Sequence, residues 1–424
     1  MEFASPYQTI AALLIVLVFA RLAGAGSRRL GQPAVVGALL AGMVLATLGA
    51  FGLPQVEMLQ RSAAVQAASN VGMFAVLLGA GVEIAPSSLM RSFRNGLAVA
   101  TGGAFLPLAA GVIAGLMFFP DNEDKLVLGF LFGVALSITA IPSTVKVLGE
   151  LGLMRSLVGR TVVAAALIDD VIGLLLVAVM AAVAGTGAGN DSWAEVARLF
   201  GGLVLFLGLT TAIGTRVYPR VRHHVKALDL AAAELFMLCA VALSYALLAE
   251  ALGLHWVLGP VMAGIYFEPD KVGTKAYNEV RLALGALSDG LVAPVFFCAI
   301  GLEFDPMAIV RNPGLVLLAV TIAIVGKLGG AGLPARYCGL SGRDATAVGI
   351  AMSARGAVEL VVLSVAVEAG LLLPEKDPFH ADLYSTLIVT AVLTTLLAPL
   401  TLRWWLRRHG AEGAEEEKPI STQR

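Results

Sequence analysis

The sequence predicts an all-α polytopic membrane protein of about 13 transmembrane helices, arranged as two inverted six-helix repeats with broken crossing helices. Three observations predict it: an apolar composition, a series of long apolar segments, and a likeness between the two halves of the chain. Of the 424 residues, 58% are hydrophobic and 14% are charged. A soluble domain is usually about 45–50% apolar and about 25% charged. Lipid is therefore the main solvent of this chain.

Thirteen segments are long enough to cross a bilayer, which takes about 20 apolar residues. The connections between them are short and leave no room for a soluble catalytic or nucleotide-binding domain. The predicted spans are 8–26, 33–51, 63–83, 95–119, 126–148, 159–184, 194–217, 229–249, 253–269, 283–302, 313–335, 343–371 and 378–405.

Lysine and arginine residues gather in the loops on one face of this topology and are rare on the other. Because positive loops stay inside, the N-terminus is expected outside and the C-terminus in the cytoplasm. We expect a bacterial inner (plasma) membrane protein in contact with lipid. The first apolar run follows only Glu2, without the positive charge of a signal peptide. The net charge of −1 gives no reason to expect binding to nucleic acid.

Two stretches of the first half recur in the second half. Leu30–Leu45 resembles Leu252–Phe267, and Gly81–Arg91 resembles Gly301–Arg311. The offset stays near 220 residues, which is the length of seven predicted spans. Because seven is odd, the two copies are expected to lie in opposite orientations in the membrane.

The likeness predicts four parts of the chain. Residues 1–186 would form the first six-helix repeat, and residues 227–408 the second, inverted one. Residues 187–226 would be a linker helix with a cytoplasmic loop, and residues 409–424 a disordered cytoplasmic tail. Inverted repeats are typical of secondary transporters, whose binding site lies near the midplane, where broken helices meet.

The fifth predicted span contains the sequence SITAIPST, from Ser137 to Thr144. Pro142 removes a backbone donor and clashes with the preceding turn, so it is expected to interrupt the helix. Backbone carbonyls freed by the interruption, with the hydroxyl of Thr139, could replace part of the hydration shell of a small cation. Ser137 and Pro142 are expected to support that site.

The twelfth predicted span, the repeat partner of the fifth, contains SARGAVE, from Ser353 to Glu359. Gly356 loosens this helix, and Arg355 places a charge inside the membrane. Arg355 and Glu359 are spaced i, i+4 and could pair along one face. We expect them mainly to hold the broken helices in place, with a direct part in transport as the alternative.

The sixth predicted span carries two adjacent acids, Asp169 and Asp170, near its middle. A charge at that depth costs at least about 2.5–3.5 kcal/mol, so such residues usually have a function. Neighbours on a helix point about 100° apart, so one acid can meet a fixed cation while the other faces a water-filled cavity. Lys327, in the middle of the eleventh span, is the expected fixed cation.

These motifs together resemble the cation:proton antiporter superfamily. The likeness rests on Asp169–Asp170, SITAIPST, GKLGG with Lys327, and PVFFCAIGLEFD from Pro294 to Asp305. It extends to about residue 408 and is strongest for the bacterial sodium/proton branch with thirteen spans and a double aspartate.

The resemblance implies exchange of a monovalent cation, Na⁺ or also Li⁺, for protons, in the service of pH homeostasis. It implies that Asp170 is the essential ion- and proton-binding acid, that Asp169 pairs with Lys327, and that Na⁺ would bind at Asp170, Asp169 and Thr139. It further implies electrogenic exchange, an elevator-like movement and a homodimer. Electroneutral relatives carry an acid and a serine where this chain has Ala140 and Ala166, which leaves fewer oxygens for the ion.

Other functions stay open at this point. A K⁺/H⁺ antiporter on the same fold is the first alternative. A cation channel would need a filter repeat or rings of acids, and a sensor would need a signalling domain; neither pattern is present in the sequence. We expect no enzyme activity and no cofactor, because no nucleophile–base set or metal-binding pattern occurs.

Overall fold

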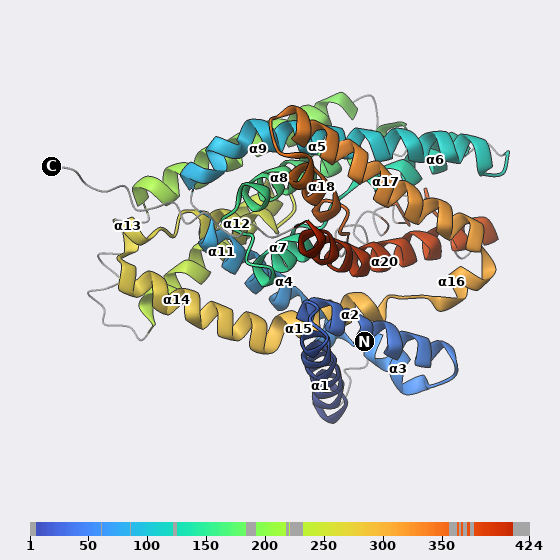
Figure 1. Ribbon diagram of the computed structural model, residues 1–424, viewed down its shortest axis with the longest axis horizontal. Coiled ribbons are helices and arrows are strands. Elements are labelled where there is room, and N and C mark those ends of the chain that lie inside the picture. The colour runs from blue at the N-terminus through green and yellow to red at the C-terminus, as the bar shows by residue number, and fades with distance from the viewer. Residues whose placement is uncertain are drawn as a thin grey trace.

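The computed structural model describes residues 6–60, 62–84, 86–121, 125–183, 192–217, 220, 232–355, 363, 366–367, 371–373 and 377–409. Within these residues every regular element is a helix (Figure 1). In the first half the helices are α1 (Pro6–Arg29), α2 (Ala34–Ala50), α3 (Pro54–Gln60), α4 (Ala63–Glu83), α5 (Pro86–Phe118), α6 (Lys125–Ser137), α7 (Ile141–Glu150), α8 (Leu157–Val183), α9 (Ser192–Ala212) and η1 (Ile213–Val217).

The second half repeats this pattern of long and interrupted helices. Its elements are α11 (Ala233–Ala251), α12 (Leu258–Ile265), α13 (Pro269–Val272), α14 (Thr274–Leu287), η2 (Ser288–Val292), α15 (Ala293–Leu302), α16 (Pro306–Arg311), α17 (Pro313–Tyr337), α18 (Gly342–Ala351) and α20 (Pro378–Arg408). The short segment η2 is π-helical and joins α14 directly to α15.

Each of the thirteen predicted apolar segments contains at least one of these helices. In the described part of the chain, nine helices are long and apolar enough to cross a membrane. The segment expected at 253–269 holds the short helix α12, which begins only at Leu258 because Gly253 has a φ of +78° and turns the chain. Much of the span expected at 343–371 lies outside the described residues. The number of thirteen spans therefore stays a prediction.

Contacts between the halves are reciprocal. A Cβ atom added to Gly42 of α2 would lie 2.1 Å from the carbonyl oxygen of Cys298 in α15. The corresponding glycine of α12, Gly264, would place its Cβ atom 2.6 Å from the carbonyl oxygen of Leu78 in α4. Two inverted copies would make such paired contacts. The division into repeats at 1–186 and 227–408 stays a prediction, and part of the linker 187–226 and most of the tail lie outside the described residues.

The helices form two groups. The first, which we name the core bundle, contains α5, α6, α8, α17, α18 and α20, which pack mainly on one another, together with α7, which follows α6 and packs on α8. The second, the scaffold bundle, contains α1, α2, α4, α11, α12, α14, η2 and α15. Across the boundary, α7 packs on α4 and α2, and α20 packs on α2. The half-helix α7 therefore connects the two bundles.

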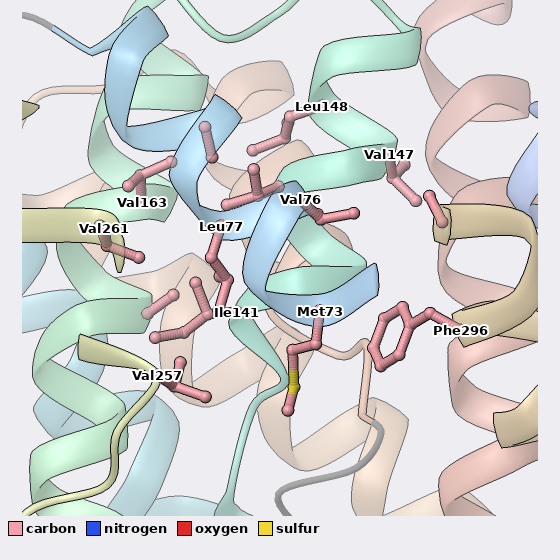
Figure 2. Packing of buried hydrophobic residues seen from close by; sticks show 14 of the residues in the cluster. Met73, Val76, Leu77, Ile141, Val147, Leu148, Val163, Val257, Val261 and Phe296 are labelled. Carbon is pink, nitrogen blue, oxygen red and sulfur yellow. The ribbon is translucent and has the colours of Figure 1, made fainter. Parts of the chain in front are cut away.

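The boundary between the bundles is apolar where α7 lies against α4 (Figure 2). We name this contact the seam. Its buried side chains come from α4, α7, α8, α12, α15 and the turn before α12, and include Met73, Val76, Leu77, Ile141, Val147, Leu148, Val163, Val257, Val261 and Phe296. Burial of this apolar surface holds the bundles together without directional bonds.

Candidate ion-binding site

An interrupted helix and the end of a second helix meet inside the core bundle. The first consists of α6 and α7, which are separated by the non-helical residues 138–140. The second begins with α18, which ends at Ala351 and is followed by a non-helical stretch up to Arg355. The N–H of Ala140 donates to the carbonyl oxygen of Ala354 at 3.0 Å, so the two interruptions are joined directly.

Pro142 explains the first interruption. Its ring nitrogen has no hydrogen to donate, and its ring excludes the helical carbonyl four residues earlier. Pro142 lies in the first turn of α7, the position in which a helix tolerates proline. Helix α6 therefore ends before it, and α7 starts anew.

Threonine hydroxyls satisfy the end of α18. The hydroxyl of Thr139 donates to the carbonyl oxygen of Met352 at 3.1 Å, and that of Thr144 donates to Ala351 at 3.2 Å. The last carbonyls of a helix have no partner within the helix, so these bonds fill a need of the fold. The contribution of Thr144 was missed in the sequence, although it lies in the same motif as Thr139.

Arg355 has the corresponding role for α6. Its guanidinium group donates to the carbonyl oxygens of Ala135 and Leu136 in the last turn of that helix. A cation is also favourable there because the C-terminal end of a helix carries partial negative charge. Arg355 is 1% exposed, and the hydroxyl of Thr395 donates to its carbonyl oxygen. The expected partner Glu359 lies outside the described residues.

Asp169 of α8 has a complete set of partners. The ammonium group of Lys327, on α17, lies 3.0 Å from both carboxylate oxygens, and the N–H of Thr139 donates to one of them at 2.8 Å. Lys327 is 0% and Asp169 is 1% exposed. A Cβ atom at Gly103 of α5 would lie 3.7 Å from the ammonium nitrogen of Lys327, an ordinary contact distance, so α5 packs directly against this side chain. The structure thus joins Asp169 to the predicted fixed cation.

Asp170 has the opposite environment. It is 2% exposed, and neither of its carboxylate oxygens has a hydrogen-bond partner among the described residues. A buried charge without a partner is very unfavourable, so the group must take up a proton or a cation to remain there. Ser143 in the first turn of α7 also has a buried hydroxyl without a partner in the described residues.

Two further predicted site residues, Ser137 and Thr139, lie at the interruption between α6 and α7. Ser137 donates its hydroxyl to the carbonyl oxygen of Val134 at 2.8 Å, which places it at the end of α6 as a structural residue. Thr139 reaches Asp169 through its backbone, while its hydroxyl oxygen keeps lone pairs that can accept or coordinate. Within the described chain, no group of three His, Cys, Asp or Glu side chains could hold a resident metal ion.

Crossed broken helices that surround buried, oppositely charged side chains define a secondary transporter of the inverted-repeat class, for which sodium/proton antiporters are established examples. Residues 14–408 match the family described as "Sodium/hydrogen exchanger, transmembrane". The chain belongs to this family. It is an integral membrane antiporter that exchanges a monovalent cation for protons.

Individual relatives are similar over nearly the full length. The chain is 28% identical to the "Na(+)/H(+)-K(+) antiporter GerN" of Bacillus cereus over 95% of this chain and 97% of that protein. It is also 28% identical to a "Na(+)/H(+) antiporter" of Enterococcus hirae, over 94% and 98% of the two chains. Among solved structures, the sodium proton antiporter MjNhaP1 of Methanocaldococcus jannaschii at pH 8 has the same fold, with a TM-score of 0.66, 18% identity, and coverage of 94% of this chain and 97% of that one.

Proposed function

We propose that the protein exchanges Na⁺ for protons and that Asp170 is the carboxylate for which the two ions compete. The observation that carries the proposal is the contrast between two adjacent buried acids. Asp169 is held by Lys327 and the Thr139 N–H, whereas Asp170 has no partner among the described residues. A carrier needs one carboxylate that is free to bind and release the transported cation or a proton.

Competition at Asp170 couples the two fluxes. When a cation occupies the carboxylate, the proton is excluded, and the reverse holds when the carboxyl group is protonated. In either case the buried charge is neutralised, which favours movement of the site through the apolar seam. An empty, charged site resists that movement, so uncoupled cycling is suppressed. The buried Ser143 hydroxyl, which has no partner among the described residues, and the Thr139 oxygen are candidates for the remaining ligands of the cation.

The Asp169–Lys327 pair has a second part in this proposal. It fixes the crossing point, because Asp169 also accepts the backbone N–H of Thr139. Release of Lys327 from Asp169 would allow a second carboxylate to take part, and transport would then move net charge. We therefore propose electrogenic exchange, with Lys327 as the group that changes partner.

The two-bundle architecture supports an elevator-type movement of the core bundle against the scaffold bundle. The scaffold would provide the contact of a homodimer, and the N-terminus would lie outside, with the C-terminus in the cytoplasm of a bacterial inner membrane. Exchange of K⁺ for protons on the same fold is the second candidate, because the name of the Bacillus cereus relative includes K⁺ as well as Na⁺.

Reconstituted liposomes test the proposal. A pH gradient is imposed, and the lumenal pH is followed after addition of Na⁺, Li⁺ or K⁺ to vesicles with wild type, Asp170→Asn or Asp121→Asn. Asp121 is the matched control, because its carboxylate is exposed and pairs with Lys125 near the start of α6. We expect Na⁺-driven proton flux in wild type and in the control, and none in Asp170→Asn. Full flux in Asp170→Asn would refute the assignment, and a response to K⁺ alone would favour the second candidate.

A further inference from the structure

A cavity of about 340 Å³ lies between the two bundles, away from the crossing point. We name it the interbundle pocket. It is bounded by α1 and the start of α2 from the scaffold, by η2 and α15, and by the ends of α7 and α20 from the core. Its charged lining consists of Arg21, Arg28, Lys146, Glu150, Asp289 and Arg403.

The charges of this lining do not balance. Lys146 of α7 forms an ion pair with Asp289 of η2. Arg21 donates to the backbone carbonyl of Asp289 at 2.8 Å rather than to a carboxylate. Arg28 and Arg403 form no ion pair with any described residue, although Glu150 lies close enough to Arg403 to interact electrostatically. Guanidinium groups are therefore in excess around the cavity.

The beginning of α2 takes up the carboxylate of Glu150, the lining acid that is not paired with Lys146. This helix of 17 residues starts at Ala34, whose N–H donates to a carboxylate oxygen of Glu150 at 2.5 Å. Free N–H groups and the helix dipole make such an end an anion-binding site, and here a carboxylate already uses it.

We propose that the interbundle pocket binds a phosphate group between Arg28 of the scaffold bundle and Arg403 of the core bundle. Arginine forks suit phosphate oxygens, which accept two parallel hydrogen bonds from one guanidinium group. The phosphate belongs either to an anionic lipid headgroup or to free phosphate. Because the ligand contacts both bundles, it stabilises the arrangement seen here and shifts the balance between the two access states.

The test uses the full chain in phosphatidylcholine nanodiscs. Phosphatidylglycerol is added in one arm and inorganic phosphate, with chloride at equal ionic strength, in another. Thermal unfolding reports stabilisation, and native mass spectrometry counts retained lipids. The variant R28Q/R403Q is compared with R29Q/R408Q, which removes two charges from the same helix ends without touching the cavity lining. If R28Q/R403Q does not fold, R28Q alone replaces it, because Arg28 is an exposed side chain.

We expect the added phosphate group to raise the unfolding temperature of wild type and of R29Q/R408Q. Loss of each pocket arginine should weaken binding about fivefold. Stabilisation by phosphatidylglycerol alone identifies a lipid headgroup, and stabilisation by both additives identifies the phosphate itself as sufficient. If neither additive stabilises wild type, or if R28Q/R403Q responds as R29Q/R408Q does, the proposal is wrong. These readouts do not involve cation transport, so they stand apart from the test of Asp170.

Discussion

The two adjacent acids should respond in opposite ways to neutralisation. Asp169→Asn leaves the ammonium group of Lys327 buried without its counter-charge, because Lys327 is 0% exposed and lies 3.0 Å from both oxygens of Asp169. Removal of one partner from a buried ion pair costs about 3–5 kcal/mol. Asp170→Asn instead removes a charge that had no partner among the described residues, so it should leave stability unchanged or raise it.

The assay is thermal unfolding of purified variants in one detergent and at one heating rate, followed by tryptophan fluorescence. A loss of 3–5 kcal/mol corresponds to a fall of roughly 6–20 °C in Tm, at about 2–4 °C per kcal/mol. Asp169→Asn/Lys327→Met should recover much of that loss, since it leaves no buried charge unpaired. The double variant is the control that separates charge from packing.

Transport and stability should therefore separate. Asp170→Asn is expected to abolish exchange with no loss of Tm, whereas Asp169→Asn is expected to lose both. If Asp169→Asn unfolds at the wild-type temperature, the ion pair with Lys327 does not hold the crossing point. If the Tm of Asp170→Asn falls by as much as that of Asp169→Asn, the argument that Asp170 carries a buried charge without a partner is refuted.

Two further predictions concern the packing of α5 on α17 and the ion pair at the bundle boundary. Gly102→Ala should lower the free energy of unfolding by about 1–3 kcal/mol, because the new Cβ atom would lie 2.2 Å from a carbonyl oxygen of α17. Gly79→Ala, whose Cβ atom would have nothing within 4 Å, should be neutral. Equal Tm values for the two variants would contradict this reasoning. Lys146→Asp breaks the pair with the exposed Asp289, so the free energy of unfolding should change by less than about 1 kcal/mol while the apparent Na⁺ affinity shifts. Lys146→Asp/Asp289→Lys should restore the affinity, and an unrestored shift would exclude the pair as its cause.

Much of the site could be predicted because charge is rare in an apolar chain. Asp169, Asp170, Lys327 and Arg355 each interrupt a run of hydrophobic residues, and a charge in such a run is costly enough to need a reason. Pro142 was visible for a similar reason, since proline has a known effect on a helix. The family and the helical fold followed from the same features.

The contacts of these residues could not be predicted. Arg355 binds carbonyl oxygens more than 200 residues away in the chain, and Thr139 reaches Asp169 through its N–H rather than its hydroxyl. Both contacts depend on how the two interruptions cross, which periodicity does not encode. The pairing of Arg355 with Glu359 stays a prediction. The interbundle pocket was missed because Arg28 and Arg403 looked like ordinary loop cations.

The apolar seam also affects how well the membrane resists passive leakage of ions. A transporter embedded in an energised membrane must not conduct ions passively, whatever its position in the cycle. Side chains such as Met73, Leu77, Ile141 and Phe296 form a buried apolar layer, and a bare ion meets a desolvation cost of tens of kcal/mol in such surroundings. Apolar contacts are also non-directional, so the two bundle surfaces could move past each other and form new apolar contacts without admitting a continuous chain of water molecules. Resistance to passive ion flow is thus a property of the whole apolar layer, and no single residue has to block the path alone.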